Sequence, residues 1–179
     1  MSVQKLLFKV IVVGDGGVGK STMIQRLTTG HFIPQKITIG TDLATFDIDI
    51  SPRVIVKLQI WDFAGEKRFR FFLPNYSRGA LGILLCYDMT RFVSFENLEE
   101  WYEVVTKNAP EAIVTLIGGK LDLASEGKRV VNTEDAEEFQ KLHDIPYFFE
   151  TSSKSGENNK SIFETICRAI IDMKNIPLQ

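Results

Sequence analysis

Cysteine is scarce in this chain, with 2 residues among 179. Cys86 lies within an apolar run, and Cys167 lies among the apolar residues of the last helical pattern. We interpret both as small core side chains of a protein from a reducing compartment. The sequence therefore predicts neither a disulfide nor a metal site built on cysteine.

An excess of charge of one sign is missing as well. The chain has 21 Lys and Arg residues against 23 Asp and Glu residues, which gives a formal net charge of -2. A balanced chain has no bulk attraction for the phosphates of nucleic acid. With 44% hydrophobic and 25% charged residues, the composition is globular. We expect a monomer with one domain over residues 1–179, long enough to bury a sizeable core.

Long hydrophobic runs are also absent. The apolar runs are only as long as strands, so no segment is expected to span a membrane. Met1, Ser2 and Val3 lack the glycine that N-myristoylation requires, and the sequence does not end in a cysteine that could be prenylated. We therefore expect a cytoplasmic protein, whose peripheral membrane association would need a lipidated tail beyond this sequence.

The strongest local motif is the glycine-rich stretch 14–21, GDGGVGKS, which stands between an apolar run at 6–13 and a helical pattern from residue 23. Glycines let backbone N–H groups turn toward one anion, and a helix start adds the favourable end of its dipole. In this GxxxxGK[ST] pattern Lys20 would reach the β- and γ-phosphates, and the Ser21 hydroxyl would bind Mg²⁺. A glycine-rich turn with a surface lysine is the alternative. The flanking strand and helix favour the phosphate loop.

Strand patterns follow the loop. Apolar and polar residues alternate over 43–50 and 54–61, on either side of a turn, which predicts a hairpin. Nearly continuous apolar runs at 80–87, 112–117 and 147–149 are typical of strands buried on both faces of a parallel sheet.

Helical patterns alternate with these strands at 92–107, 133–143 and 158–174. Alternation of strands and helices indicates layers of helices on both faces of a sheet. We predict a three-layer α/β fold with a six-stranded, mostly parallel sheet, in which the hairpin adds one antiparallel strand at the edge side.

Unusual side chains follow the carboxyl ends of the predicted strands, where ligands bind in open parallel sheets. After the third strand, Asp62 could hold a water of Mg²⁺, and the N–H of Gly65 could meet a terminal phosphate. A turn aspartate and a turn glycine are the alternative, which the nearby phosphate loop disfavours. The stretches GGKLD at 118–122 and ETSSK at 150–154 follow the fifth and sixth strands and could enclose a base.

These motifs together resemble the small GTPases of the Ras superfamily. GDGGVGKS, WDFAG, GGKLD and ETSSKSG stand in the superfamily's order, and KLQIWDFAGEKRFR, RGALGILLCYD and TIG are most similar to its Rab branch. The resemblance covers nearly the whole chain. It implies the P-loop NTPase fold and a GTP-hydrolysing switch that binds GTP, GDP and Mg²⁺. It also implies effectors, exchange factors and GTPase-activating proteins as partners, and membrane trafficking as the setting.

The resemblance assigns the base pocket. Asp122 would accept hydrogen bonds from the N1 and N2 hydrogens of guanine, which adenine cannot supply, and the N–H of Ser153 would meet the guanine carbonyl. Lys120 would lay its alkyl stem on one face of the ring. Phe32 would cover the other side, with ordinary loop packing as the alternative. Lys154 would be a supporting contact.

Two loops, 31–41 and 65–76, are the predicted switches. The hydroxyl of Thr38 would bind Mg²⁺ and its N–H the γ-phosphate; Thr41 is a competitor that the TIG pattern disfavours. The implied metal ligands are Ser21, Thr38 and, through water, Asp62, and the implied catalytic residues are Lys20, Thr38, Gly65 and Glu66. The implied nucleotide contacts are Asp15, Gly16, Gly17, Val18, Gly19, Lys20, Ser21, Thr22, Phe32, Thr38, Gly65, Lys120, Asp122, Leu123, Ser152, Ser153 and Lys154.

Two residues depart from the family pattern. Glu66 replaces the glutamine that orients the attacking water. An ionised carboxylate cannot donate a hydrogen bond and repels the nucleotide, so we expect slow hydrolysis; a neutral Glu66 that donates, a general base, or a merely exposed side chain are the alternatives. Gly119 replaces the asparagine of NKxD, which removes hydrogen bonds between the base loop and the phosphate loop and should weaken nucleotide binding.

The second switch offers two further features. We find no obvious arginine finger in cis, and expect Arg68 and Arg70 to face solvent or a partner. The spacing of Phe69, Phe72, Leu73 and Tyr76 would form one face of a short helix, either packed on the sheet or open to effectors.

Three functions therefore compete. The first is a GTP-hydrolysing switch, the second a pseudo-GTPase that binds nucleotide and partners without useful turnover, and the third a P-loop ATPase or kinase. Glu66 and Gly119 are the features that support the pseudo-GTPase. Asp122 and the loop around Ser153 argue against the ATPase or kinase.

Overall fold

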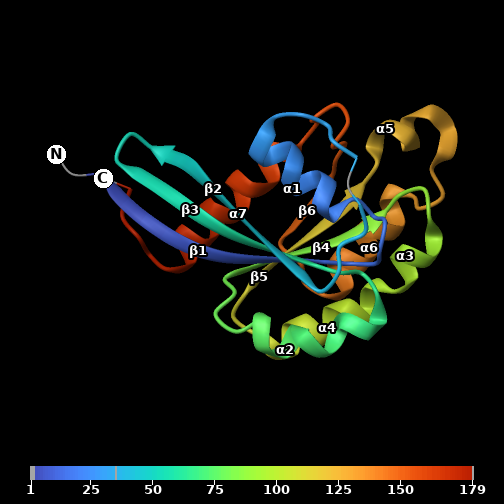
Figure 1. Ribbon diagram of the computed structural model, residues 1–179, viewed down its shortest axis with the longest axis horizontal. Coiled ribbons are helices and arrows are strands. Elements are labelled where there is room, and N and C mark those ends of the chain that lie inside the picture. The colour runs from blue at the N-terminus through green and yellow to red at the C-terminus, as the bar shows by residue number, and fades with distance from the viewer. Residues whose placement is uncertain (1–2, 35, 179) are drawn as a thin grey trace.

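A computed structural model describes residues 3–34 and 36–178 of the chain. Its centre is a six-stranded sheet in the order β2-β3-β1-β4-β5-β6 (Figure 1). Only the pairing of β2 with β3 is antiparallel, and the other neighbours are parallel. The predicted sheet is confirmed. Its strands are β1 (Gln4–Val13), β2 (Thr41–Ser51), β3 (Val54–Phe63), β4 (Gly82–Asp88), β5 (Ile113–Gly119) and β6 (Tyr147–Glu150).

Helices cover both faces because the buried strand side chains alternate between them. Along β1, Val10 and Val12 pack into the core that includes residues of α1 (Lys20–Thr29) and α7 (Asn159–Met173). Ile11 and Val13 pack into the opposite core, with α2 (Leu73–Tyr76), α4 (Leu98–Asn108) and α6 (Thr133–Leu142). In Figure 1, α1 and α7 lie above the sheet and α2 and α4 below it.

The predicted helix over 92–107 is wrong in one respect, because the structure divides it into α3 (Phe92–Glu96) and α4. The junction is Asn97, whose ψ of -6° departs from the regular helical value. Its side-chain amide donates to the Asp15 carboxylate at 2.7 Å, so a contact with another segment coincides with the break. Apolar periodicity continues across the junction, which is why the sequence pattern shows one helix.

Short helical segments add detail that the sequence pattern does not contain. A 3₁₀ helix, Lys67–Phe72, precedes α2 in the predicted second switch. After β5, the three-residue α5 (Leu121–Leu123) runs into a π-helical turn, Ala124–Lys128. These elements are too short for a hydrophobic period to be recognisable.

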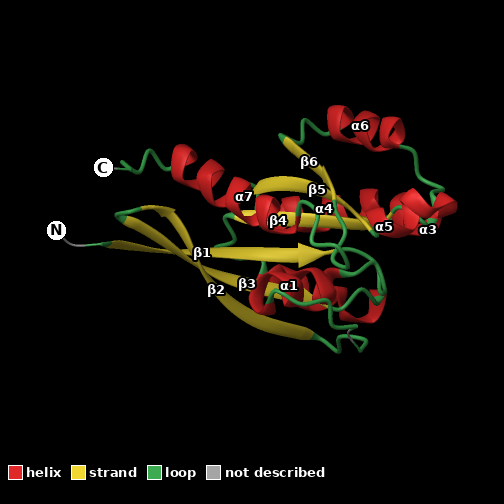
Figure 2. Ribbon diagram, turned by 90° about the horizontal axis from the view of Figure 1, so that it is seen from above, coloured by secondary structure: helices red, strands yellow, loops and turns green. Residues whose placement is uncertain are grey.

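The carboxyl ends of the parallel strands point to one edge of the sheet. Figure 2 shows the arrowhead of β1 leading into the loop before α1, with other loops gathered beside it. Both cysteines are buried and free, as we expect of core side chains. Burial raises the pKa of each thiol to about 12. Within the described residues, no helix combines the length and apolar character needed to cross a bilayer.

Candidate functional site

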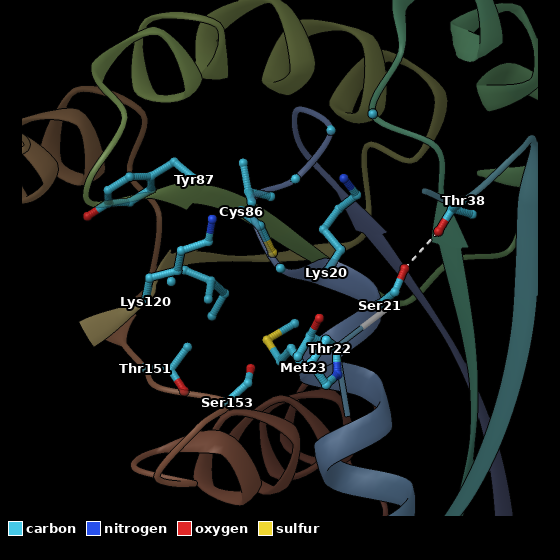
Figure 3. A pocket seen from close by; sticks show the side chains of 18 of the residues that line it. Lys20, Ser21, Thr22, Met23, Thr38, Cys86, Tyr87, Lys120, Thr151 and Ser153 are labelled. Atoms are coloured by element: carbon cyan, nitrogen blue, oxygen red, sulfur yellow. Dashed lines mark hydrogen bonds between the residues drawn. The ribbon is translucent and has the colours of Figure 1, made fainter. Parts of the chain in front are cut away.

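A cavity of about 360 Å³ opens at this edge, within the size range of small-molecule sites. Segments from all over the chain meet there, and Figure 3 shows Ser21 and Thr38 on one side and Lys120, Thr151 and Ser153 on the other. The cavity is lined by most of the residues predicted to bind nucleotide, namely Gly16, Gly17, Val18, Gly19, Lys20, Ser21, Thr22, Phe32, Thr38, Gly65, Lys120, Asp122, Leu123, Ser153 and Lys154. Glu66 also lines it.

The glycine-rich loop wraps one end of the cavity. Gly17 and Gly19 have φ values of 76° and 103°, which only glycine adopts easily. Gly65, at the end of β3, packs directly on this loop, because a Cβ there would overlap the backbone of Asp15 and Gly16. The segment after β3 and the phosphate loop therefore touch through their main chains.

Lys20 lies at the floor of the loop with 6% of its surface exposed. Its Nζ donates to the carbonyl oxygens of Gly14 and Asp15, both at 2.8 Å. Burial lowers the pKa of Lys20, and nearby Asp62 opposes that shift. No carboxylate among residues 3–34 and 36–178 forms an ion pair with this ammonium. A phosphate in the cavity would supply the missing counter-charge.

The three predicted metal ligands come together from three segments. The Ser21 hydroxyl lies 2.7 Å from that of Thr38 (Figure 3). It also donates to the Asp62 carboxylate. Thr38 also donates to Asp62 at 3.4 Å. Thr41 instead starts β2, opposite Phe63 in the ladder. The geometry therefore favours Thr38 over Thr41.

These residues fit a hard divalent cation. Asp62 is 4% exposed, and its Oδ1 has no hydrogen-bond partner within the described part of the chain. Burial raises the pKa of Asp62, while the Ser21 hydrogen bond and the charge of Lys20 oppose the shift. Two hydroxyls and one carboxylate suit Mg²⁺, which takes oxygen ligands and completes its shell with phosphate and water. The described residues hold no group of three or more His, Cys, Asp or Glu side chains that could bind a metal by themselves.

The far end of the cavity carries Asp122. The Ser152 hydroxyl donates to its Oδ1 at 2.8 Å, and this serine is buried outside the cavity lining. The Ser152 hydroxyl thus orients the Asp122 carboxylate, and a contact of Ser152 with the nucleotide stays a prediction. Lys120 adopts a left-handed φ of 65°, and its Nζ pairs with Asp88 at 2.7 Å, so its stem runs along the cavity wall.

The Asp15 side chain bonds to residues outside the cavity, and the predicted nucleotide contact of Asp15 stays a prediction. Its carboxylate accepts hydrogen bonds from Asn97 Nδ2 at 2.7 Å and from Trp101 Nε1 at 2.8 Å, and Asp15 does not line the cavity. The side chain therefore ties the phosphate loop to α3 and α4. The pattern GDGGVGKS identifies the loop but contains no information on where this side chain turns.

In the second switch, Arg68 is exposed as predicted and pairs with Glu66 at 2.7 Å. The prediction that Arg70 faces solvent or a partner is wrong. Arg70 is 12% exposed, pairs with Glu100 at 2.7 Å and lies 4.1 Å above the Trp101 ring. Its guanidinium packs on α4, so it is not available as a finger in this arrangement.

Two residues of the predicted apolar face, Leu73 and Tyr76, pack on the sheet. Leu73 is fully buried, and Tyr76 contacts the rings of Trp61 and Phe63 at centroid distances of 5.3 and 5.8 Å. Phe71 remains 69% exposed. Packing on the sheet thus accounts for Leu73 and Tyr76, and an open surface for Phe71.

Sequence reasoning missed residues that follow β4. Arg91 Nη2 donates to the Gly16 carbonyl at 2.6 Å, and Asp88 holds Lys120. Ligands bind at the carboxyl ends of parallel strands, and β4 is one of these strands. This rule could have indicated residues 88–91 as part of the site. The pair of Arg129 with Glu150 at 2.7 Å, which lowers the pKa of Glu150 and fixes the end of β6, has no comparable signal.

Comparisons with known proteins agree with this geometry. The chain matches the model of the Ras family over residues 9–172. It is 41% identical over 166 residues to the Ras-related protein RABA1c of Arabidopsis thaliana, covering 92% of this chain and 75% of that protein. It is 40% identical over 171 residues to the human Ras-related protein Rab-30, covering 94% and 82%. To the Ras-related protein Rab11B of Nicotiana tabacum it is 38% identical over 181 residues, covering 96% and 82%.

Proposed function

Because the chain belongs to the Ras family and is a Rab-like small GTPase, we propose that it is a slow, Mg²⁺-dependent switch between GTP and GDP states in membrane trafficking. The proposal is supported by one cavity with a phosphate loop at one end and an oriented carboxylate, Asp122, at the other. A nucleotide would fit this cavity with its phosphates at the glycine-rich loop and its base at Asp122.

The phosphate end binds through charge and main-chain donors. Backbone N–H groups of residues 16–21 surround the terminal phosphates, and the Lys20 ammonium provides the cation for the β- and γ-oxygens. Because Lys20 is already desolvated and held by two carbonyls, little further ordering is needed when phosphate binds.

The base end selects guanine. Asp122 accepts two hydrogen bonds, from N1–H and from the 2-amino group, and Ser152 keeps the carboxylate in the plane that this bidentate contact needs. Adenine offers an unprotonated N1 in place of the N1–H donor, so Asp122 would lose the two donors that guanine supplies and would face an acceptor instead. A polar pocket of this kind rejects the wrong ligand by roughly 10⁴-fold.

The cation and the first switch form the nucleotide sensor. When bound, Mg²⁺ would neutralise part of the negative charge of the nucleotide phosphates. Ser21, Thr38 and Asp62 are the residues that would hold it. Thr38 sits on the loop 31–41 and gains its phosphate contact only with GTP, so loss of the γ-phosphate releases this loop. Gly65, packed on Gly16, offers its N–H to the same phosphate from the second switch.

Hydrolysis is the weak step. A water attacks the γ-phosphorus and the bond to the β–γ bridging oxygen breaks, which yields GDP and inorganic phosphate. Glu66 can accept a hydrogen bond from the water but, when ionised, cannot donate one to the phosphoryl oxygens. Its pairing with Arg68 and its 40% exposed side chain also support the second candidate function, a guanine-nucleotide binding module with no useful turnover.

The Asp122→Asn variant tests the proposed base recognition. Asparagine offers one acceptor and one donor, which matches the N1–H and 2-oxo groups of xanthine, whereas guanine presents two donors. Calorimetry should show GDP affinity falling by at least about 100-fold, while XDP becomes the better ligand.

Lys154→Gln is the control for a residue at the same rim, and we expect it to keep the preference for GDP. If Asp122→Asn binds GDP and XDP as the wild type does, Asp122 does not read the base and the proposed function loses its support.

A further inference from the structure

Arg91 lies immediately after β4, in a turn that fixes its backbone. Its N–H donates to the Asp88 carbonyl at 3.0 Å, and its own carbonyl accepts from the Ser94 hydroxyl at 2.7 Å. Asp88 is in turn held by the N–H and hydroxyl of Thr90 at 2.8 and 2.6 Å. The side chain therefore starts from a rigid point at the rim of the phosphate loop.

The guanidinium is directed at two consecutive loop residues. Its Nη2 donates to the Gly16 carbonyl at 2.6 Å, and its Nη1 lies 3.5 Å from the place a Cβ on Gly17 would take. Within the described chain, Arg91 forms no ion pair with a carboxylate, and its buried Nε has no partner. The positive charge of Arg91 thus remains unneutralised beside the loop.

Three consecutive carbonyls of the loop are held by cations. Lys20 takes those of Gly14 and Asp15, each at 2.8 Å, and Arg91 takes that of Gly16. Burial lowers the pKa of Lys20, and the charge of Arg91 adds to that effect. Two cations that have no carboxylate partner in the described chain are both bonded to one glycine loop, and their charge favours an anion in the cavity that this loop lines.

The trans peptide between Gly16 and Gly17 connects the Arg91 hydrogen bond to phosphate binding. In a trans peptide the C=O and N–H groups point in opposite directions. Arg91 holds the carbonyl from outside the loop, so the N–H of Gly17, a residue that lines the cavity, is directed inward. A charge-assisted bond to the carbonyl also polarises the peptide and strengthens its N–H as a donor.

We propose that Arg91 is a positioning residue for the nucleotide phosphates, which acts through the Gly16–Gly17 peptide by orienting and polarising the Gly17 N–H. The inference rests on the proposed nucleotide site. It assigns a third cationic contribution to phosphate binding, beside Lys20 and Mg²⁺, from a residue that does not itself touch the ligand.

The test compares Arg91→Gln with wild type in GDP and Mg²⁺. We expect calorimetry to show GDP affinity weakened by about tenfold to a hundredfold. In ¹H–¹⁵N spectra of the GDP complex, the Gly17 amide proton should move upfield, because its peptide is less polarised, while the Gly19 amide shifts far less. Arg91→Lys keeps a charge and one donor and should fall between the two proteins in both measurements.

Arg53→Gln is the matched control, since Arg53 lies in the exposed turn between β2 and β3, and it should leave both measurements unchanged. If Arg91→Gln fails to fold, Arg91→Lys carries the test through the same amide shift. A wild type that does not bind GDP would contradict the proposed function. A wild type that binds GDP, with Arg91 variants of equal affinity and unchanged Gly17 amide, would overturn only the role of Arg91.

Discussion

Glu66 lines the cavity next to Gly65, and in the proposed switch it is the residue on which we expect the hydrolysis rate to depend most. Its Oε2 lies 2.7 Å from Arg68 Nε, and the two side chains are 40% and 68% exposed. Exposed ion pairs contribute about 0–1 kcal/mol, so this pair does not fix Glu66 firmly. An exposed acidic side chain that pairs with Arg68 agrees better with the proposed slow hydrolysis than a buried carboxyl that could donate a hydrogen bond would.

Replacing Glu66 with glutamine should therefore accelerate hydrolysis. The amide keeps the size of the side chain, removes a repulsive charge and adds a donor. We expect Glu66→Gln to raise the single-turnover rate at pH 7 by about tenfold, equivalent to about 1.4 kcal/mol of barrier. Glu111→Gln, an exposed change outside the cavity, should leave the rate unchanged. A glutamine variant no faster than the wild type would refute this role for Glu66.

At the scale of elements, α4 connects the phosphate loop to the second switch. One turn of this helix presents Trp101, which donates to Asp15 and carries Arg70 on its ring, and Glu100, which pairs with Arg70. The break at Asn97 brings a second donor to Asp15. The phosphate loop and the second switch therefore contact the same helical turn. Because Trp101 is fully buried, we expect a movement of the loop or of the switch to be transmitted to the other through this side chain.

The end of β5 meets the phosphate loop at Gly119. A Cβ added there would lie 3.0 Å from the Val18 carbonyl and 3.4 Å from the Tyr87 carbonyl. The two elements are thus close enough for an asparagine amide to bridge them, although the loop must yield by a few tenths of an ångström. Because residue 119 is glycine in the wild-type chain, it has no side chain that could bridge the two elements.

Comparison of Gly119→Asn with Gly119→Ala separates the bridge from its steric cost. Both variants carry the same Cβ, but only asparagine adds hydrogen bonds, each contributing about 1 kcal/mol. We expect GDP to dissociate about tenfold more slowly from the asparagine variant than from the alanine variant, measured with a fluorescent GDP analogue. Equal dissociation rates would mean that the elements are already coupled by other contacts.

For the whole molecule, hydrophobic periodicity and the rule of strand ends were sufficient to predict the sheet, its two helical layers and the cavity. Alternation along β1 follows directly from the two faces of a buried strand. The prediction for Arg70 is wrong and Arg91 was missed, and both have long polar side chains. Each reaches a partner more than 20 residues away, and a linear pattern holds no information on that partner. For the same reason, the motif at 150–154 does not indicate that the Ser152 hydroxyl donates to Asp122.

The most direct measurement is calorimetric titration of the nucleotide-free protein with GDP and with ADP in the presence of Mg²⁺. The two ligands share their phosphates and ribose and differ in the base, so the comparison isolates the base contacts, chief among them those of Asp122. The account predicts that GDP binds at least about 10³-fold more tightly than ADP. Equal affinities for the two nucleotides would contradict it.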